Sequence, residues 1–463
     1  MMKDVGVLIL RKVVMTEGPI LKSVIKFSIP IILGALIQVG FNAVDLMVVG
    51  QMGDASAVAA VGAVGPIVGL LVSSFLGLSA GVDAVLARCL GQNDGKRARI
   101  VVSTSLIFSF LFGLFVTVLC LVFSKPLLVA SGCEEEYFTQ SAQYMNLYAI
   151  GIPAIMVYNF ASGVIRTSGD TQKPFIYLVI AGVVNVVLNY LLCLVFAQKA
   201  AAVALATTIS QYVGAVLSFV YILRDKGACN FSFKNIRFSF GELKNILRFG
   251  IPSAFNTMLF ALSNVQMNAA INSYGLYATA GNAAASTLES LSGSFTNGFS
   301  VATVAFVGQN VGAEKPKRVK LSILTCLIVA VSVQMVASLT IFALREQVLS
   351  LYIPDAPEAV RFAVSRMRHV LIFMPMATVA NIFISSTKAF GYSIVPMLIS
   401  IIAVLGFRVL WLEAIYPRLE LIEHTIDNVY LCYTCSWILH FVGNTVAFLV
   451  IYHRYKKGKI VQI

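Results

Sequence analysis

Two carboxylates interrupt long stretches of the chain that otherwise lack charge. Asp45 lies in the tract 27–82, whose other acidic residue belongs to the turn-like stretch 50–54, and Glu289 lies in the tract 249–313. An acidic side chain inside an apolar segment is costly and is by default a functional hypothesis. Such a group can carry a proton or bind sodium; the alternative is a carboxylic acid that only joins helices through neighbouring amides.

Amide side chains accompany both carboxylates at helical spacing. Gln38, Asn42 and Asp45 follow one another at intervals of four and three residues, so they share one face of a helix. Near Glu289, the preceding segment carries Asn264 and Asn268, four residues apart. We therefore expect two polar groups, one in each half of the chain, although interhelical hydrogen bonding is the alternative for any single Asn.

The composition places these polar groups in a membrane protein. The 463 residues are 58% hydrophobic and only 12% charged, with a mean hydropathy of +0.86. A soluble domain carries about 25% charge, which excludes a water-soluble globule. The 31 Phe and 17 Tyr exclude a disordered chain.

The intervals between charges predict twelve membrane-spanning helices, because a span needs about 20 apolar residues. The tracts 27–82 and 249–313 are each long enough for two helices. Eight further tracts contain no Asp, Glu, Lys or Arg: 100–124, 137–165, 174–198, 200–223, 321–344, 370–387, 389–407 and 428–453. The predicted fold class is an all-α integral membrane protein, since continuous apolar runs do not suit a β-barrel.

The distribution of basic residues predicts the orientation. Most of the 34 Lys and Arg residues fall at the two ends and in alternate loops, and such loops are cytoplasmic. The other loops carry acidic residues, including the run 134–136. We expect a multi-pass protein of the plasma (cytoplasmic) membrane with both termini in the cytoplasm. The net charge of +13 reflects this topology, and no nucleic-acid partner is expected, because the basic residues are scattered.

The chain is an internal duplication. A shift of 222 residues superimposes Pro30 on Pro252 and Gly169 on Gly391, and a shift of 217 matches Gly91-Gln92-Asn93 to Gly308-Gln309-Asn310. Six spans per half imply two six-helix bundles related by a pseudo-two-fold axis along the membrane normal. The predicted order is a cytoplasmic N-terminal segment (1–22), an N-lobe (23–224), a cytoplasmic linker (225–244), a C-lobe (245–455) and a cytoplasmic tail (456–463).

Cysteine, histidine and the N-terminus indicate neither a metal site nor a signal peptide. Most of the eight Cys lie in predicted spans, Cys432 and Cys435 have no second pair, and the four His are dispersed. The apolar stretch near the N-terminus is too short for a signal core. Met15 is a plausible alternative start, which would make residues 1–14 an extension.

Several short motifs together resemble the multidrug and toxic compound extrusion (MATE) transporters over residues 16–456. They are the Gly-Gln-Asn loops, Val44-Asp45-Leu46 with Val49-Gly50, Gly169-Asp170-Thr171, and Ala204-Leu205-Ala206-Thr207. The resemblance implies a cation site made of Asp45, Asn185, Asn189 and Thr207. Asn189 departs from the family pattern, which has an aspartate there, so the site would offer one carboxylate and neutral oxygens.

The resemblance implies an antiporter rather than an enzyme, with a proton or sodium as coupling ion and no cofactor. A lipophilic, cationic organic compound would be exported, and Pro30 and Pro252 would act as hinges. We expect a monomer that binds this small substrate between the lobes. The expected substrate-binding residues are Gln38, Asn42, Tyr158, Asn264, Asn268 and Glu289.

Two other functions fit a polytopic chain. A lipid-linked oligosaccharide flippase of the same superfamily would share the twin-bundle design, but it requires a strongly cationic site, and Arg408 is the deeply placed arginine in the sequence. An intramembrane transferase would require paired acidic metal ligands or a His/Asp constellation, which the sequence lacks.

Overall fold

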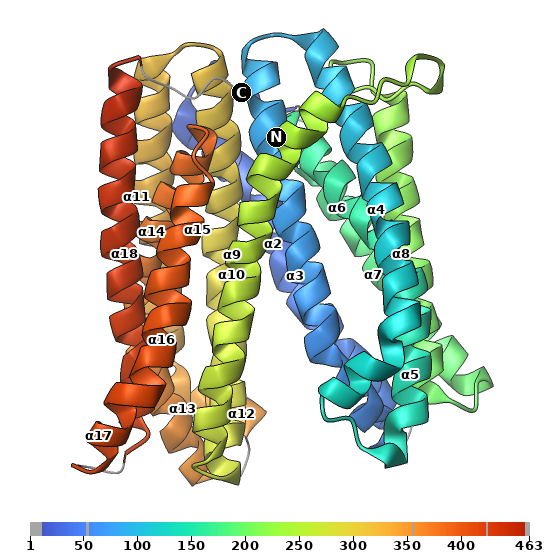
Figure 1. Cartoon of the computed structure of the whole chain (residues 1–463), viewed down its shortest axis with the longest axis vertical. Helices are drawn as coiled ribbons and strands as arrows, with labels where there is room; N and C mark the ends of the chain where they lie inside the picture. The colour runs from blue at the N-terminus through green and yellow to red at the C-terminus, as the bar shows by residue number, and fades with distance from the viewer. Residues whose placement is uncertain (1–11, 52–54, 354–355, 423–424, 459–463) are drawn as a thin grey trace, which may run out of the picture. The chain divides into compact units, whose positions relative to one another are not determined.

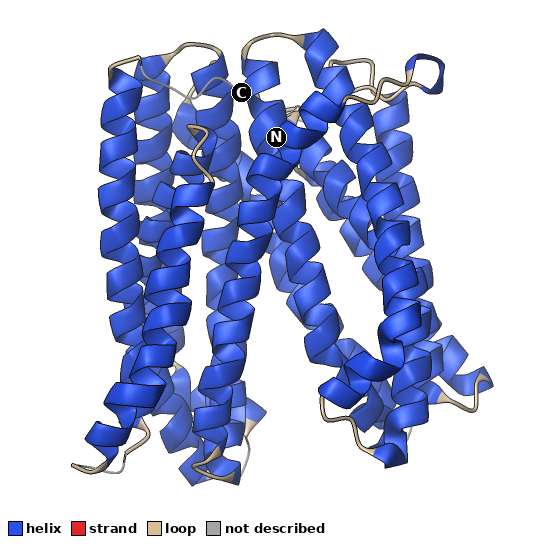
Figure 2. Cartoon of the chain, viewed as in Figure 1, coloured by secondary structure: helices blue, strands red, loops and turns tan. Residues whose placement is uncertain are grey.

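The structure is a computed structural model that describes residues 12–51, 55–353, 356–422 and 425–458. Every regular element in these ranges is a helix (Figure 2). The side chains of residues 41–47, within a helix, lie outside the described part. The all-helical fold class is confirmed.

The chain divides into two compact units, which are described separately. Unit 1 comprises residues 1–14 and 29–251, and unit 2 comprises residues 15–28 and 252–463. Two helices continue from one unit into the other: α2 (Ile20–Gln51) enters unit 1 at Ile29, and α9 (Phe240–Asn272) enters unit 2 at Pro252. Pro30 and Pro252 thus stand at the two transitions, where proline removes one helical hydrogen bond.

Unit 1 is a bundle in which α6 packs against α3, α4 and α8, and α7 packs against α8 (Figure 1). Its helices are long because the helical conformation continues beyond each apolar run into the polar residues at its ends. Besides most of α2, they are α3 (Ala55–Gly91), α4 (Gly95–Ala130), α5 (Glu135–Ile150), α6 (Ile152–Thr167), α7 (Gln172–Val195) and α8 (Lys199–Arg224), followed by the short η1 (Phe233–Asn235).

Unit 2 is a second bundle, in which α10 packs against α11, α13 and α14, and α18 packs against α13 and α14. One of its membrane segments is broken into short α- and π-helical pieces. Besides most of α9, the elements are α10 (Leu276–Gly312), α11 (Pro316–Ala343), α12 (Arg345–Tyr352), α13 (Pro357–Val370), η2 (Leu371–Phe373), α14 (Met374–Ala389), α15 (Ile394–Ser400), η3 (Ile401–Gly406), α16 (Phe407–Leu410), η4 (Trp411–Ile415), α17 (Tyr416–Glu420) and α18 (Asp427–Lys456).

Ten helical segments of the described part are long and apolar enough to cross a membrane, and the bent pair α5–α6 makes eleven. Each of the twelve predicted spans corresponds to a helix or to a series of consecutive helical pieces. The twelfth is α10, which has 37 residues but carries Asn, Ser, Thr and Gly along its length. The most polar of the predicted spans therefore belongs to unit 2.

The two halves repeat the same helices, but the predicted register of the repeat is wrong after the second helix of each half. Helix α3 ends at Gly91 and its counterpart α10, also 37 residues long, ends at Gly312, which is 221 residues later. The turns that follow place Asn93 and Glu314 at φ 58° and 55°. Gly91-Gln92-Asn93 therefore corresponds to residues 312–314, because the turn conformation, and not the shared letters, fixes the equivalence.

The segment before α2 is bound to both units. The Val13 N–H donates to the Gly169 carbonyl oxygen at 2.8 Å within unit 1. In unit 2, the Asn310 amide donates to the Met15 carbonyl oxygen at 3.1 Å, and the Arg318 guanidinium also donates to it, at 3.2 Å. The last residues before Met15 are therefore part of the folded structure.

Candidate functional site

Unit 1 brings together three of the four residues expected in the cation site. Asn189 and Asn185 lie one turn apart on α7, and the Asn189 amide donates to the Asn185 carbonyl oxygen at 3.3 Å. The Asn185 amide in turn donates to the Thr207 hydroxyl on α8 at 3.2 Å. Both Asn side chains are buried. This series joins α7 to α8 through neutral groups that can also offer oxygen atoms to a cation.

The acidic member of the predicted site is not described at side-chain level. Asp45 and Asn42 lie in α2, and their side chains belong to residues 41–47, outside the described part. Gln38 lies on the same helix, one turn before Asn42 and two turns before Asp45, and its side chain is exposed. The helical spacing expected for these three residues is therefore present.

Tyr158 occupies a position between helices of unit 1. Its hydroxyl donates to the Pro174 carbonyl oxygen at 3.2 Å, and its ring packs beside Gly214 of α8. Tyr158 thus links α6 to the start of α7. Its proposed contact with substrate is a separate prediction.

A third carboxylate, Asp83, is buried on α3. The Thr167 hydroxyl donates to its Oδ1 at 3.1 Å, and Arg166 lies 3.8 Å from its Oδ2. Gly163 leaves room for it, because a Cβ there would lie 2.7 Å from Asp83 Oδ1. Asp83 is buried because α6 packs against α3.

Unit 2 contains a buried ion pair at Glu289 of α10. The Arg366 guanidinium on α13 donates from Nε to Oε1 at 2.8 Å and from Nη2 to Oε2 at 2.7 Å. Glu289 is 8% exposed and Arg366 is 5% exposed. Two parallel hydrogen bonds between ionised groups form the strongest arrangement of this pair. Glu289 therefore contributes no net negative charge to this region.

An amide pair extends this ion pair towards α9. Arg366 also donates from Nη1 to the Asn282 side-chain oxygen, and the Asn282 amide donates to the Asn268 oxygen at 3.1 Å. Asn268 is exposed on α9. Glu289 and Asn268, both predicted as substrate-binding residues, thus belong to one hydrogen-bonded network.

Arg408 on α16 forms a second buried cationic group next to the first. Its Nη1 donates to the Asn264 oxygen at 3.0 Å and to the Ser263 hydroxyl at 3.2 Å, and its Nε donates to the Ser436 hydroxyl at 3.2 Å. The Tyr433 ring is shared: the guanidinium carbon of Arg408 lies 4.5 Å from its centroid and that of Arg366 lies 5.1 Å from it. Cation–π attraction to this ring favours both guanidinium groups.

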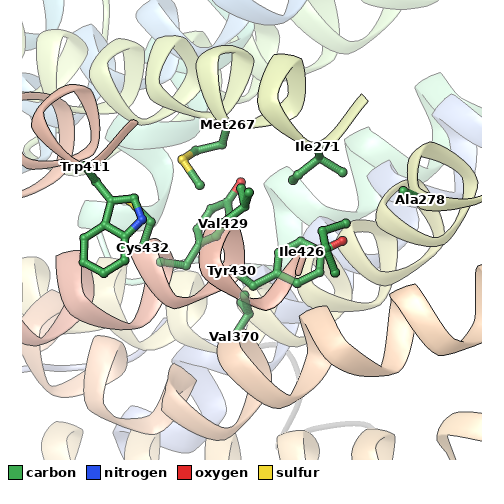
Figure 3. Close-up of a cluster of buried hydrophobic side chains, with 10 residues drawn as sticks. Met267, Ile271, Ala278, Val370, Trp411, Ile426, Val429, Tyr430 and Cys432 are labelled. Atoms are coloured by element: carbon green, nitrogen blue, oxygen red, sulfur yellow. The ribbon is translucent and has the colours of Figure 1, made fainter. Parts of the chain in front are cut away.

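Apolar side chains surround one side of this polar group. Figure 3 shows Met267 of α9, Trp411 beside α16, Tyr430 of α18 and Val370 of α13 in one cluster of buried side chains. Such a surrounding lowers the local dielectric constant and strengthens the electrostatic interactions inside it.

The sequence reasoning missed Arg366. It lies before the predicted span 370–387, in a segment assigned to an outer loop, but α13 continues the helix from Pro357. The buried positions Ala359, Ala363, Arg366 and Val370 recur at intervals of four, three and four residues. This periodicity is the signal that places Arg366 on the inner face.

Long apolar helices with buried ion pairs and amide networks in two repeated units define a membrane transport protein. The MatE family model matches residues 30–191 and again residues 252–411. The chain therefore belongs to the MATE family of multidrug efflux transporters. The two matches begin at Pro30 and Pro252, which confirms the duplication.

Several known proteins and solved structures are similar to this chain over two thirds or more of its length. The chain is 26% identical over 445 residues to the "Probable multidrug resistance protein YoeA" of Bacillus subtilis (strain 168), covering 94% of this chain and 93% of the relative. It is 25% identical over 318 residues to an "FAD transporter" of Shewanella oneidensis, covering 67% and 70%. A solved MATE structure in the bent conformation has a TM-score of 0.85 at 20% identity and covers 96% of this chain and 97% of that chain.

Proposed function

We propose that the chain is a secondary active antiporter that exports small lipophilic organic compounds in exchange for protons or sodium ions. The observation that carries the ion-coupling part is the hydrogen-bonded series Asn189, Asn185 and Thr207 in unit 1. Buried neutral oxygens of this kind need one carboxylate to balance the charge of a cation. Asp45 is the family residue that supplies it.

In the proposed cycle, an ion that binds at Asp45 from outside favours release of the substrate. The two lobes, within the limits 23–224 and 245–455, then rock against one another around Pro30 and Pro252, with the pseudo-two-fold axis along the membrane normal. Gln38, Asn42 and Tyr158 would contact the substrate from the N-lobe, and Asn264 and Asn268 from the C-lobe. We further propose that the protein works as a monomer in the cytoplasmic membrane with both termini in the cytoplasm.

The charge of the substrate needs a separate argument. The family resemblance implied a cationic substrate, which a negative charge at Glu289 would favour, but Arg366 neutralises that charge. The Shewanella oneidensis relative is named for FAD, an anionic molecule. Membership of the family is therefore compatible with either a cationic or an anionic substrate.

Transport in proteoliposomes tests the proposal. Efflux of a fluorescent lipophilic compound is measured under separately imposed proton and sodium gradients. We expect Asp45→Asn to reduce gradient-driven efflux by about tenfold or more, because the variant removes the only charge of the cation site. Glu136→Gln, at an exposed position in the first turn of α5, is the matched control. Equal efflux by the Asp45 variant and the wild type under both gradients would refute the coupling role.

A gain-of-function variant tests the neighbouring position. Asn189→Asp restores the carboxylate that the family pattern has at this position. The second negative charge should strengthen sodium binding, which would appear as a sodium-dependent rise of the thermal unfolding midpoint. A variant with no greater sodium response than the wild type would remove Asn189 from the site.

A further inference from the structure

Arg408 is a buried cation whose hydrogen-bond partners, in the part of the chain that the structure describes, are all neutral. It is 1% exposed, and its hydrogen bonds go to the neutral side chains of Ser436, Ser263 and Asn264. No carboxylate among the residues that the structure describes forms an ion pair with it. A guanidinium keeps its charge in proteins, and buried charges are normally paired.

Arg366 provides an internal comparison for Arg408. Both guanidinium groups lie against the Tyr433 ring, but Arg366 has both oxygens of Glu289 as acceptors. Two arginines and one carboxylate leave this buried group with one positive charge in excess. The excess lies on Arg408, whose Nη2 makes no hydrogen bond to the residues that the structure describes.

The backbone around Arg408 is unusual. The four-residue helix α16 that carries it is flanked by π-helical turns, η3 (Ile401–Gly406) before it and η4 (Trp411–Ile415) after it. Such turns are rare and occur frequently at functional sites. One such turn lies on each side of this buried arginine. This arrangement indicates that the helix positions Arg408 for a purpose other than spanning the membrane.

Arg408 lies directly beneath a surface side chain of α9. Asn264 is exposed, and its amide oxygen accepts one hydrogen of Arg408 Nη1. A rotation of the Asn264 side chain would free this donor. The guanidinium would then present Nη1 and Nη2 together, the forked geometry that matches a carboxylate.

We propose that Arg408 binds a carboxylate group of the exported compound, with Asn264 as the side chain that covers the site when it is empty. The substrate carboxylate then neutralises the charge of Arg408, as Glu289 neutralises the charge of Arg366. The inference rests on the proposed function, since it names the substrate class of that transporter.

Tryptophan fluorescence offers a direct binding assay. The sequence contains two tryptophans, and both Trp411 and Trp437 belong to the apolar cluster beside Arg408. Purified full-length protein is titrated with octanoate, octanamide and octyltrimethylammonium, which carry alkyl chains of nearly equal length and differ in the charge of the head group. We expect octanoate to bind about tenfold more tightly than the other two, a difference of about 1.4 kcal/mol.

Three variants separate binding at Arg408 from general charge effects. In Arg408→Gln, the preference for octanoate over octanamide should disappear. Asn264→Ala keeps the arginine and frees a donor, so octanoate should bind severalfold more tightly with octanamide unchanged. Arg361→Gln removes the same charge from an exposed position of α13 and should leave the preference intact. The Asn264 variant keeps the test decisive if Arg408→Gln does not fold.

The outcomes also distinguish this site from the proposed transport function. Equal affinity for the three probes, or a preference unchanged in both the Arg408 and the Asn264 variants, would overturn the carboxylate site. Octanoate selectivity that depends on Arg408, without ion-driven efflux in proteoliposomes, would keep the site and refute the antiport.

Discussion

Arg366 of α13 holds Glu289 of α10 by two parallel hydrogen bonds of 2.8 Å and 2.7 Å, although the two residues are 77 positions apart in the chain. Both residues are buried, and the Arg366 guanidinium lies over the Tyr433 ring. A buried ion pair contributes little compared with apolar residues of the same size, but loss of one partner leaves an uncompensated charge.

A double-mutant cycle tests this relationship. Glu289→Gln and Arg366→Gln should each destabilise the protein by about 3–5 kcal/mol, because each leaves one buried charge without its partner. The double variant should be more stable than the sum of the single effects predicts. Thermal unfolding in detergent measures all three. Additive losses would mean that the two side chains do not interact in the native protein.

The close approach of α3 and α9 inside unit 1 depends on Gly81. A Cβ at this position would lie 2.2 Å from the Ile246 carbonyl oxygen and 2.7 Å from the Gly250 nitrogen. Both are backbone atoms, so Gly81→Ala should separate the helices and cost about 1–3 kcal/mol or more. Gly69→Ala, on the same helix with no atom within 4 Å, is the control and should leave the unfolding midpoint unchanged or slightly higher. Equal midpoints for both variants would contradict the packing.

The attachment of the N-terminal segment to unit 1 depends on Gly169. This residue has φ +97°, and a Cβ would lie 2.4 Å from the Val13 carbonyl oxygen. Gly169→Ala should therefore release the segment and speed trypsin cleavage after Lys12, which otherwise pairs with Asp225 at 2.8 Å. Gly132 also has a positive φ, +75°, but no atom lies within 4 Å of a Cβ added there. Gly132→Ala is therefore the control for backbone strain alone. The same cleavage rate in both variants would show that Gly169 does not hold the segment.

Cys229, in the loop between α8 and α9, should resist alkylation. Burial disfavours the thiolate and raises the pKa of the Cys229 thiol to about 12. Compared with an ordinary cysteine of pKa about 8.5, the thiolate fraction at pH 7.5 is lower by about three thousandfold. In a variant that retains Cys229 alone, maleimide labelling should keep rising with pH beyond 10. The same variant unfolded in SDS is the control, and rapid labelling of the folded protein at neutral pH would contradict the burial.

Much of the fold follows from local information. Tracts such as 100–124 and 428–453 are apolar over a full membrane thickness, and hydropathy sums over neighbouring residues, so α4 and α18 were predictable. The limits were harder, because helices such as α9 begin in polar sequence at Phe240. The repeat was visible from Pro30 and Pro252, while its register near Asn93 required the turn conformation.

The candidate site was predictable in part. The family resemblance implied Asn185, Asn189 and Thr207, and the hydrogen bonds of the structure bring these three side chains together. Glu289 was identified as an acidic side chain within a span, but its partner Arg366 was not. A partner 77 residues away depends on how α10 packs against α13, which periodicity within one helix does not contain.

By itself the sequence determined the all-helical membrane class, the duplication and the identity of the intramembrane polar residues, since each depends on composition, spacing or self-similarity along the chain. Only the tertiary structure decided which charges neutralise one another. Coulomb energies depend on distances of a few ångströms between atoms of different helices. In the folded protein, the carboxylate of Glu289 pairs with Arg366, and Arg408 contacts neutral side chains.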